Sequence, residues 1–249
     1  MTTDFSGIAD DFFVNLDLQT TLALPDNRET ILRFCEAVQK EFRQMTSLYQ
    51  RESGEFVLEG DRESGSYQWM ELQSHRLSAG AFSPAKLSDA YHFHNWLLDR
   101  SVYFLGIGGL DVEALDLLFG FNLDCHGNRD AIVAEALLAG SPLGALLAEH
   151  PVQAVECQPS LVVSLDEGCY TQARLSLETR GSSYQVRTGN YDDEPISVYF
   201  TIRRYPVPGQ VLDIRRSLAE QCDVAEDLVA RVIIPQVLRP IEAAISSAG

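Results

Sequence analysis

The sequence predicts an α+β fold made of two diverged pseudo-repeats, each with the order strand, helix, antiparallel strands, helix. Short runs in which apolar and polar residues alternate are typical of strands with one buried face. Segments with apolar residues at helical spacing separate these runs. The pattern that opens the chain also returns near its middle. We therefore expect antiparallel sheet, continuous or paired, with helices packed on one face.

In the first predicted half, residues 1–106, Val14 and Leu16 alternate with polar residues and predict a strand within residues 12–24. Asp26 and Glu29 then have the spacing of a capping box. Apolar residues at helical intervals follow them, so we expect a helix that runs to Phe42.

Two strand-like runs and a second helix complete this half. Residues 47–59 and 67–79 flank the turn-rich segment 60–66 and predict a hairpin. Ser83-Pro84 has the form of a helix N-cap followed by proline at the first helical position. Residues 101–118 leave open the end of this helix, a strand or another short helix.

The second predicted half, residues 107–249, repeats the opening pattern. Phe121–Asp124 resembles Val14–Asp17, and residues 128–133 resemble residues 27–32. Further strands are predicted at residues 161–163, 170–177, 184–187 and 196–205, the last two joined by a polar hairpin tip. A long helical region ends the chain, and Pro235 and Pro240 should kink or interrupt it.

This order of elements is similar, in topology only, to the duplicated saddle-shaped folds of the TATA-binding-protein type. No motif of that family is present in the chain. The negative charge of the chain also opposes the DNA-binding function of that family.

Composition limits the partners. The chain has 249 residues, of which 45% are hydrophobic, and its formal net charge is −17. That charge repels phosphate, so we expect neither nucleic acid nor an anionic membrane as a partner, and a basic partner or cationic ligand fits better. No signal peptide or roughly 20-residue apolar span is present, and the five cysteines are scattered. We expect a soluble, cytoplasmic protein with reduced thiols.

Four arginines are the first candidate ligand-binding residues: Arg203, Arg204, Arg215 and Arg216. They form the concentrated positive charge of an acidic chain and could bind a carboxylate or phosphate group of a ligand or partner. The alternative is that they pair with acidic residues of the same chain.

His92 and His94 are the second candidate pair. On a helix, residues two apart point in directions about 200° apart, so they cannot face one metal ion there. The alternative places His94 partly buried beside Tyr91 or Trp96 and leaves His92 in solvent. Because no catalytic triad, metal-ligand spacing or complete cofactor motif is present, the sequence predicts no catalytic residue, metal or cofactor.

Three functions fit these observations. The first is a non-enzymatic binding or scaffold protein that holds a protein, peptide or small ligand on its sheet face or in a groove between the halves. The second is an enzyme or metal-dependent protein with a pocket at that junction, lined by the arginine pairs and some of His75, His92, His94, Cys125 and His126. The third is an acidic chaperone-like protein for a basic client. Tyr67, Trp69, Tyr91 and Trp96 would contribute to binding if a groove exposed them together, and would otherwise be core residues.

Overall fold

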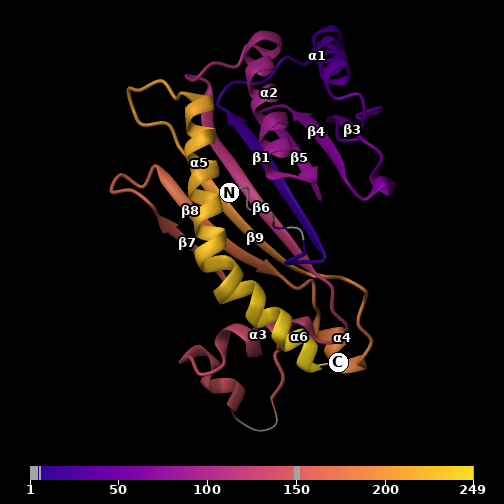
Figure 1. Cartoon of the computed structure of the whole chain (residues 1–249), viewed down its shortest axis with the longest axis vertical. Helices are drawn as coiled ribbons and strands as arrows, with labels where there is room; N and C mark the ends of the chain where they lie inside the picture. The colour runs from indigo at the N-terminus through magenta and orange to yellow at the C-terminus, as the bar shows by residue number, and fades with distance from the viewer. Residues whose placement is uncertain (1–4, 6, 149–151, 249) are drawn as a thin grey trace.

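The computed structural model describes residue 5, residues 7–148 and residues 152–248. Within these residues, nine strands form one open antiparallel sheet with the order β2-β3-β4-β5-β1-β6-β9-β8-β7 (Figure 1). The strands are β1 (Asp11–Thr20), β2 (Ser47–Gln50), β3 (Phe56–Glu59), β4 (Tyr67–Gln73), β5 (Arg76–Phe82), β6 (Val112–Leu123), β7 (Ser160–Ser164), β8 (Thr171–Glu178) and β9 (Ile196–Arg204). The α-helices of the described residues are α1 (Arg28–Glu41), α2 (Leu87–Leu105), α3 (Arg129–Leu138), α4 (Ser183–Thr188), α5 (Ile214–Leu228) and α6 (Arg239–Ala248).

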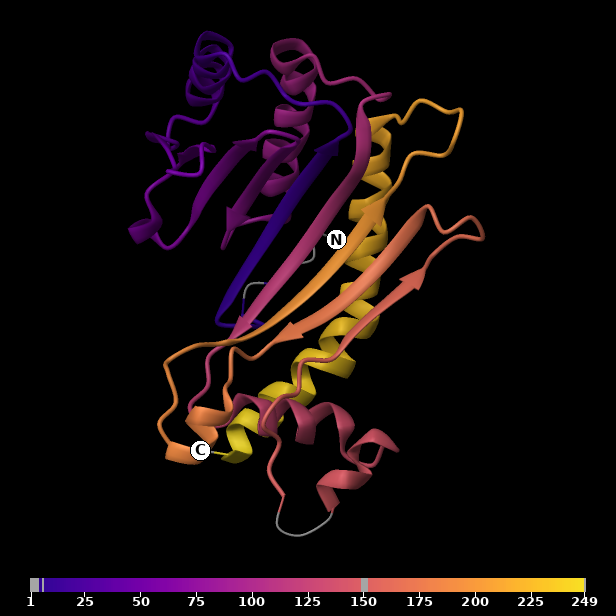
Figure 2. The same ribbon diagram turned by 180° about the vertical axis from the view of Figure 1, so that it is seen from behind.

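The helices leave one face of the sheet open. Figure 1 shows α2 and α5 in front of the strands, and Figure 2, seen from behind, shows the strands in front of these helices. In both views α3 and α4 lie at one end of the sheet. We call the two faces the helix side and the helix-free face.

The central strand pair is β1 with β6. It runs antiparallel from the partners Asp11 and Asn122 to Thr20 and Val112. Val14, Leu16 and Leu18 of β1 are fully buried on the helix side. Because side chains alternate along a strand, the intervening residues of β1 point to the helix-free face, as the polar alternation predicts.

The two predicted halves share this one sheet. Outward from β1 the order is β5, β4, β3, β2, and outward from β6 it is β9, β8, β7. The predicted boundary after Gly106, the C-cap of α2, falls in the loop before β6. The first helix of each half begins at an asparagine cap, because Asn27 Oδ1 accepts from the Thr30 amide at 2.8 Å and Asn128 Oδ1 accepts from the Ala131 amide at 3.1 Å.

Local turn chemistry corrects several predicted boundaries in the first half. Residues 47–59 and 67–79 were each predicted as one strand, but the first run is the β2–β3 hairpin and the second spans β4 and most of β5. Gly54, with a φ of 105°, lies in the first turn, whereas the turn at Ser74-His75 contains neither glycine nor proline. The N-cap of α1 is Asn27 rather than Asp26.

Other boundaries differ further along the chain. The N-cap of α2 is Lys86, because Ser83 has a φ of 43° and lies before the helix. The segment 101–118 contains the end of α2, a loop and the start of β6. Residues 184–187 belong to α4 and not to a strand, because Ser182 and Gln185 form a capping box.

The C-terminal helical region keeps a helical backbone through its prolines. A π-helical segment, Val229–Leu238, contains Pro235 and joins α5 to α6. Proline has no amide hydrogen to donate, and α-type hydrogen bonding is interrupted around Pro235, as predicted. The prediction was wrong for Pro240, which is the second residue of α6, where an amide hydrogen has no partner within that helix. No helix in the described part of the chain is long and apolar enough to cross a membrane.

We predict that His94 makes the fold sensitive to acid. Its side chain is 0% exposed, and burial lowers its pKa from 6.5 to about 3. Below pH 6.5 the unfolded chain therefore binds a proton that the folded chain excludes, which costs up to about 1.4 kcal/mol per pH unit. Urea unfolding at pH 7 and pH 5 should show that His94→Leu loses less stability than the wild type on acidification.

The exposed His92 provides the control for this prediction. His92→Leu should keep the pH dependence of the wild type. An unchanged pH dependence in His94→Leu would contradict the prediction.

Candidate functional site

The helix-free face carries a line of half-buried aromatic side chains from both halves of the chain. Strand register places Tyr67 opposite Phe82 and Phe82 opposite Phe13. Gly120 of β6 follows opposite Phe13, and Tyr199 of β9 lies opposite Gly120. We call Tyr67, Phe82, Phe13 and Tyr199 the aromatic row.

The rings of the aromatic row lie close enough to interact. Ring centroids are 5.2 Å apart for Tyr67 and Phe82 and 6.1 Å apart for Phe82 and Phe13, and both pairs are stacked. Phe13 and Tyr199 meet edge to face at 6.3 Å. Such pairs stabilise a sheet surface by up to about 1.5 kcal/mol beyond simple burial. The row is therefore a continuous aromatic surface across β4, β5, β1 and β9.

Two glycines make room for the aromatic rings. A Cβ at Gly120 would lie 2.1 Å from Cζ of Phe13, so that ring covers the glycine. A Cβ at Gly80 would lie 2.4 Å from Nε1 of Trp69, which covers the neighbouring part of the same face. Aromatic rings that cover glycines are a known device for stabilising sheets. The rings thus contribute to stability while remaining half exposed.

Cations of the chain itself contact both ends of the aromatic row. The Arg62 guanidinium lies 5.9 Å from the ring centroid of Tyr67. Arg180 Nη2 donates to the Tyr199 hydroxyl at 3.0 Å. The first contact is a cation–π interaction, although Arg62 is also held by its ion pair with Glu59.

A line of polar side chains crosses the helix-free face four residues farther along β1. Register brings Glu71, Ser78, Asp17, Asp116 and Arg203 side by side on β4, β5, β1, β6 and β9. Arg203 Nε donates to Asp116 Oδ1 at 2.7 Å, and the Ser78 hydroxyl donates to Asp17. Burial is the main reason that the pKa of Asp17 is raised, and the facing Asp116 adds to the effect. We call this line the polar row.

The four arginines predicted as ligand-binding residues do not converge. Arg203 is on the helix-free face, and its ion pair with Asp116 raises its pKa. Arg204 points to the helix side, where Nη1 donates to the Thr171 hydroxyl at 2.7 Å and Nη2 lies 3.6 Å from Glu220. The pairs Arg215–Asp99, at 3.2 Å, and Arg216–Glu220, at 2.9 Å, lie on the protein surface. The structure thus contains the intramolecular pairs of the alternative interpretation, and a ligand role for these arginines stays a prediction.

The histidines named for a junction pocket are spread over the molecule. His92 is exposed and His94 is buried on α2, as helix geometry predicts. His75 lies at one end of the sheet, in the β4–β5 turn. Cys125 and His126 follow β6 at the other end of the sheet. There, Nδ1 of His126 lies 3.7 Å from Oδ1 of Asp193. Among the described residues, no group of three or more His, Cys, Asp or Glu side chains is placed to hold a metal ion.

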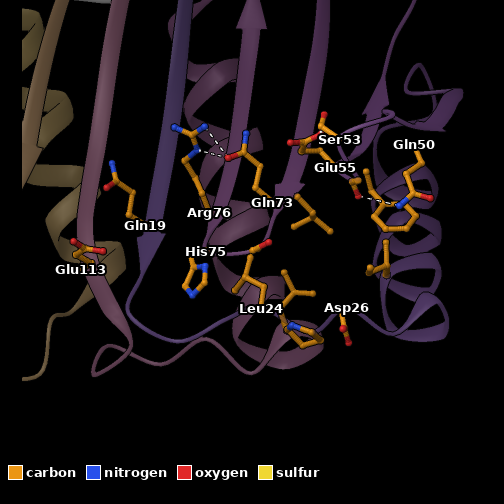
Figure 3. A pocket seen from close by; sticks show the side chains of 17 residues that line it. Gln19, Leu24, Asp26, Gln50, Ser53, Glu55, Gln73, His75, Arg76 and Glu113 are labelled. Carbon is orange, nitrogen blue, oxygen red and sulfur yellow. Dashed lines mark hydrogen bonds between the residues drawn. The ribbon is translucent and has the colours of Figure 1, made fainter.

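His75 does line a cavity of about 620 Å³, shown in Figure 3. The loop after β1, the β2–β3 hairpin and the β4–β5 turn form most of this cavity, and Glu113 of β6 adds a carboxylate from the second half. Within the lining of this cavity, Nε and Nη2 of Arg76 donate to Gln73 Oε1 at 3.1 and 2.8 Å. The cavity therefore combines polar side chains with the apolar Leu24, Ile31 and Leu72.

Comparisons with known proteins assign no function to this site. No family model matches the chain, and no curated protein matches it.

The sequence alone indicated only part of the aromatic surface. Tyr67 and Trp69 lie on the helix-free face, whereas Tyr91 and Trp96 belong to α2. Phe13, Phe82 and Tyr199 were not predicted as site residues. The sequence does contain one signal: Phe13 is an aromatic residue at a position of β1 where the alternation otherwise places polar residues. The residues that lie beside Phe13 are set by the register between strands far apart in the sequence.

We predict that Gly120→Ala destabilises the fold, because the new methyl group would displace the Phe13 ring. Overpacking of this kind costs about 1–3 kcal/mol. Urea unfolding should show that loss for Gly120→Ala. Gly108→Ala is the control, since its nearest atom would lie 3.4 Å away, and equal losses in the two variants would contradict the prediction.

We also predict that Asp17→Asn stabilises the protein at neutral pH. The raised pKa of Asp17 means that its charge costs the folded state free energy, and that this cost grows as pH rises from about 4 through the folded pKa. Removing the charge should raise the free energy of unfolding at pH 7 by a few tenths to about 1 kcal/mol. Urea titrations at pH 4 and pH 7 should show a gain at pH 7 that shrinks at pH 4.

Asp11→Asn, on the same face at the other end of β1, is the matched control. A loss of stability in Asp17→Asn at pH 7 would show that the charge helps the polar row.

Proposed function

We propose that this chain is a non-enzymatic binding protein that holds a basic segment of a partner protein across the helix-free face of its sheet. One observation carries the proposal: four partly buried aromatic side chains from both halves form a row on the face that no helix of the described residues covers. Partly exposed apolar side chains that form one patch with a polar border are typical of an interaction site.

The chemistry of the aromatic row favours a basic partner. Aromatic faces attract Lys and Arg side chains and also pack against aliphatic ones. The contact of Arg62 with Tyr67 is an example within the chain. The net charge of −17 adds a long-range attraction for a basic segment and repels an acidic one.

The occupant would bind through its side chains. In the middle of the sheet, β5, β1, β6 and β9 have neighbours on both edges, so their backbone groups are already paired. Rings and ion pairs are therefore the groups offered to a partner there. The acidic chaperone hypothesis also has a basic partner, but it relies on charge alone. The salt dependence of binding therefore separates that hypothesis from the proposed function.

The fold proposal that accompanies this function is that the halves are diverged copies. Two observations support it: in each half the last strand lies next to the first and the earlier ones follow outward, and the first helix of each half has an asparagine cap, Asn27 or Asn128. A duplicated sheet would explain why both halves contribute rings to one face.

Tryptophan fluorescence can test the proposed function. Trp69 lies beside the aromatic row, and a Trp96→Phe background leaves it as the single tryptophan. A twelve-residue peptide of alternating Lys and Leu should change its emission in a saturable way. The same peptide with Glu in place of Lys should bind at least tenfold more weakly.

Leucine substitutions identify the surface that binds. The double variant Phe13→Leu/Phe82→Leu keeps apolar volume but removes two ring faces, and it should weaken binding about tenfold. Tyr103→Leu is the control, because Tyr103 is 81% exposed on α2. Equal binding of both peptides, or equal affinity in wild type and double variant, would overturn the proposal. Binding abolished by 0.5 M salt and insensitive to the double variant would favour the chaperone hypothesis.

A further inference from the structure

The helix side of β3 and β4 is covered in the first half of the chain, whereas that of β7 is bare in the second half. In the first half, α1 packs beside α2, and Leu58 of β3 and Met70 of β4 are fully buried. In the second half, α3 packs against α6 at the end of the sheet (Figure 1). Leu161 and Val163 of β7 are consequently 63% and 42% exposed.

These two side chains face the helix side, because register pairs Leu161 with Leu175 and Val163 with Ala173 on β8. The same rows continue to Phe200 and Ile202 of β9, which are core residues under α5. A strip of apolar side chains therefore runs from the core out to the edge of the sheet without a helix above its outer part.

A groove of about 710 Å³ opens beside this strip, where the β7–β8 turn, the start of β8 and the end of β9 face α5. Its apolar lining includes Leu165, Ile202, Val207, Val224 and Leu228. We call this space, together with Leu161 and Val163, the α5 groove.

Two residues that line the α5 groove also carry unused hydrogen-bonding groups. Gln221 is 2% exposed, and its Nε2 donates to the carbonyls of Leu115 and Ile202, both at 2.8 Å. Its Oε1 and the Nε of Arg204 are buried and have no hydrogen-bond partner within the described chain. Both residues line the groove. Since buried polar groups normally find a partner, an occupant with a polar side chain here would satisfy them.

The net charge of the chain favours a basic occupant. Asp166, Glu220 and Asp227 line the groove, and Glu220 and Asp227 also pair with Arg216 and Arg231 next to it. The chain as a whole is strongly acidic, so a second copy would be repelled more than a basic protein would.

We propose that the α5 groove binds an amphipathic helix of another protein. The apolar face of that helix, with one Asn or Gln, packs on Leu161, Val163 and Leu165, and its Lys and Arg residues point outward toward the acidic rim. A helix fits better than a strand, because the exposed apolar groups are on the face of β7 rather than on its edge, and helices recognise such grooves through residues at helical spacing. This site is separate from the helix-free face of the proposed function.

Cys169 allows a direct test. It lies in the β7–β8 turn and is exposed, whereas Cys35, Cys125, Cys157 and Cys222 are buried. An environment-sensitive fluorophore on Cys169 should respond in a saturable way to an 18-residue Lys/Leu peptide with helical spacing and one central Asn. Circular dichroism should show that the peptide gains helix on binding. In the Phe13→Leu/Phe82→Leu background, which removes the site on the helix-free face, a peptide of the same composition in alternating, strand-like order should bind at least tenfold more weakly by the Cys169 signal.

Variants of β7 locate the contact. Leu161→Ser/Val163→Ser should weaken binding at least tenfold, and both positions are exposed enough to tolerate serine. Val162→Ser is the matched control, because Val162 is 52% exposed on the opposite face of the same strand. The Phe13→Leu/Phe82→Leu variant should bind the helical peptide normally, which separates this inference from the proposed function.

Three results would overturn the inference. The first is no saturable response to the helical peptide. The second is equal or tighter binding of the strand-like peptide, which would indicate pairing at the edge of β7. The third is an equal effect of Val162→Ser and the double serine variant.

Discussion

The antiparallel pairing of β1 with β6 is the constraint on which the rest of the structure depends. The pair joins the two halves of the chain into one sheet, and its register from Asp11–Asn122 to Thr20–Val112 sets which residues share a row. Because side chains alternate with a period of two, a shift by one residue would move Leu16 to solvent and Asp17 into the core. The same register brings Phe13 between Phe82 and Tyr199, so core and candidate site depend on one alignment.

The two faces of the sheet are stabilised in different ways. On the helix side, apolar residues of β1, β6 and β9 pack under α2 and α5 and provide the hydrophobic driving force. On the helix-free face, the aromatic and polar rows must remain stable next to water. The rings do so by covering Gly80 and Gly120, and the carboxylates do so through hydrogen bonds and ion pairs, as Asp116 does with Arg203. Stability and binding chemistry therefore coexist on that face.

The positions of α1 and α3 distinguish the part of the sheet that the first half of the chain forms from the part that the second half forms. Both α1 and α3 begin at an asparagine cap after the first strand of their half. However, α1 packs beside α2, whereas α3 packs against α6. The helix side of β7 consequently lacks the cover that β3 has, and its apolar residues are exposed. An edge strand with exposed apolar residues favours contact with another molecule, which a protein must either use or prevent.

Local patterns alone determined much of this molecule. The alternation in β1 and β9 and the helical spacing in α1 and α5 follow from near neighbours in the chain, and the net negative charge follows from composition. Other features required the tertiary structure. Phe13 and Tyr199 become neighbours across Gly120 only through strand register over long sequence separations. The exposure of Leu161 and the burial of His94 depend equally on where distant helices pack, which local spacing does not encode.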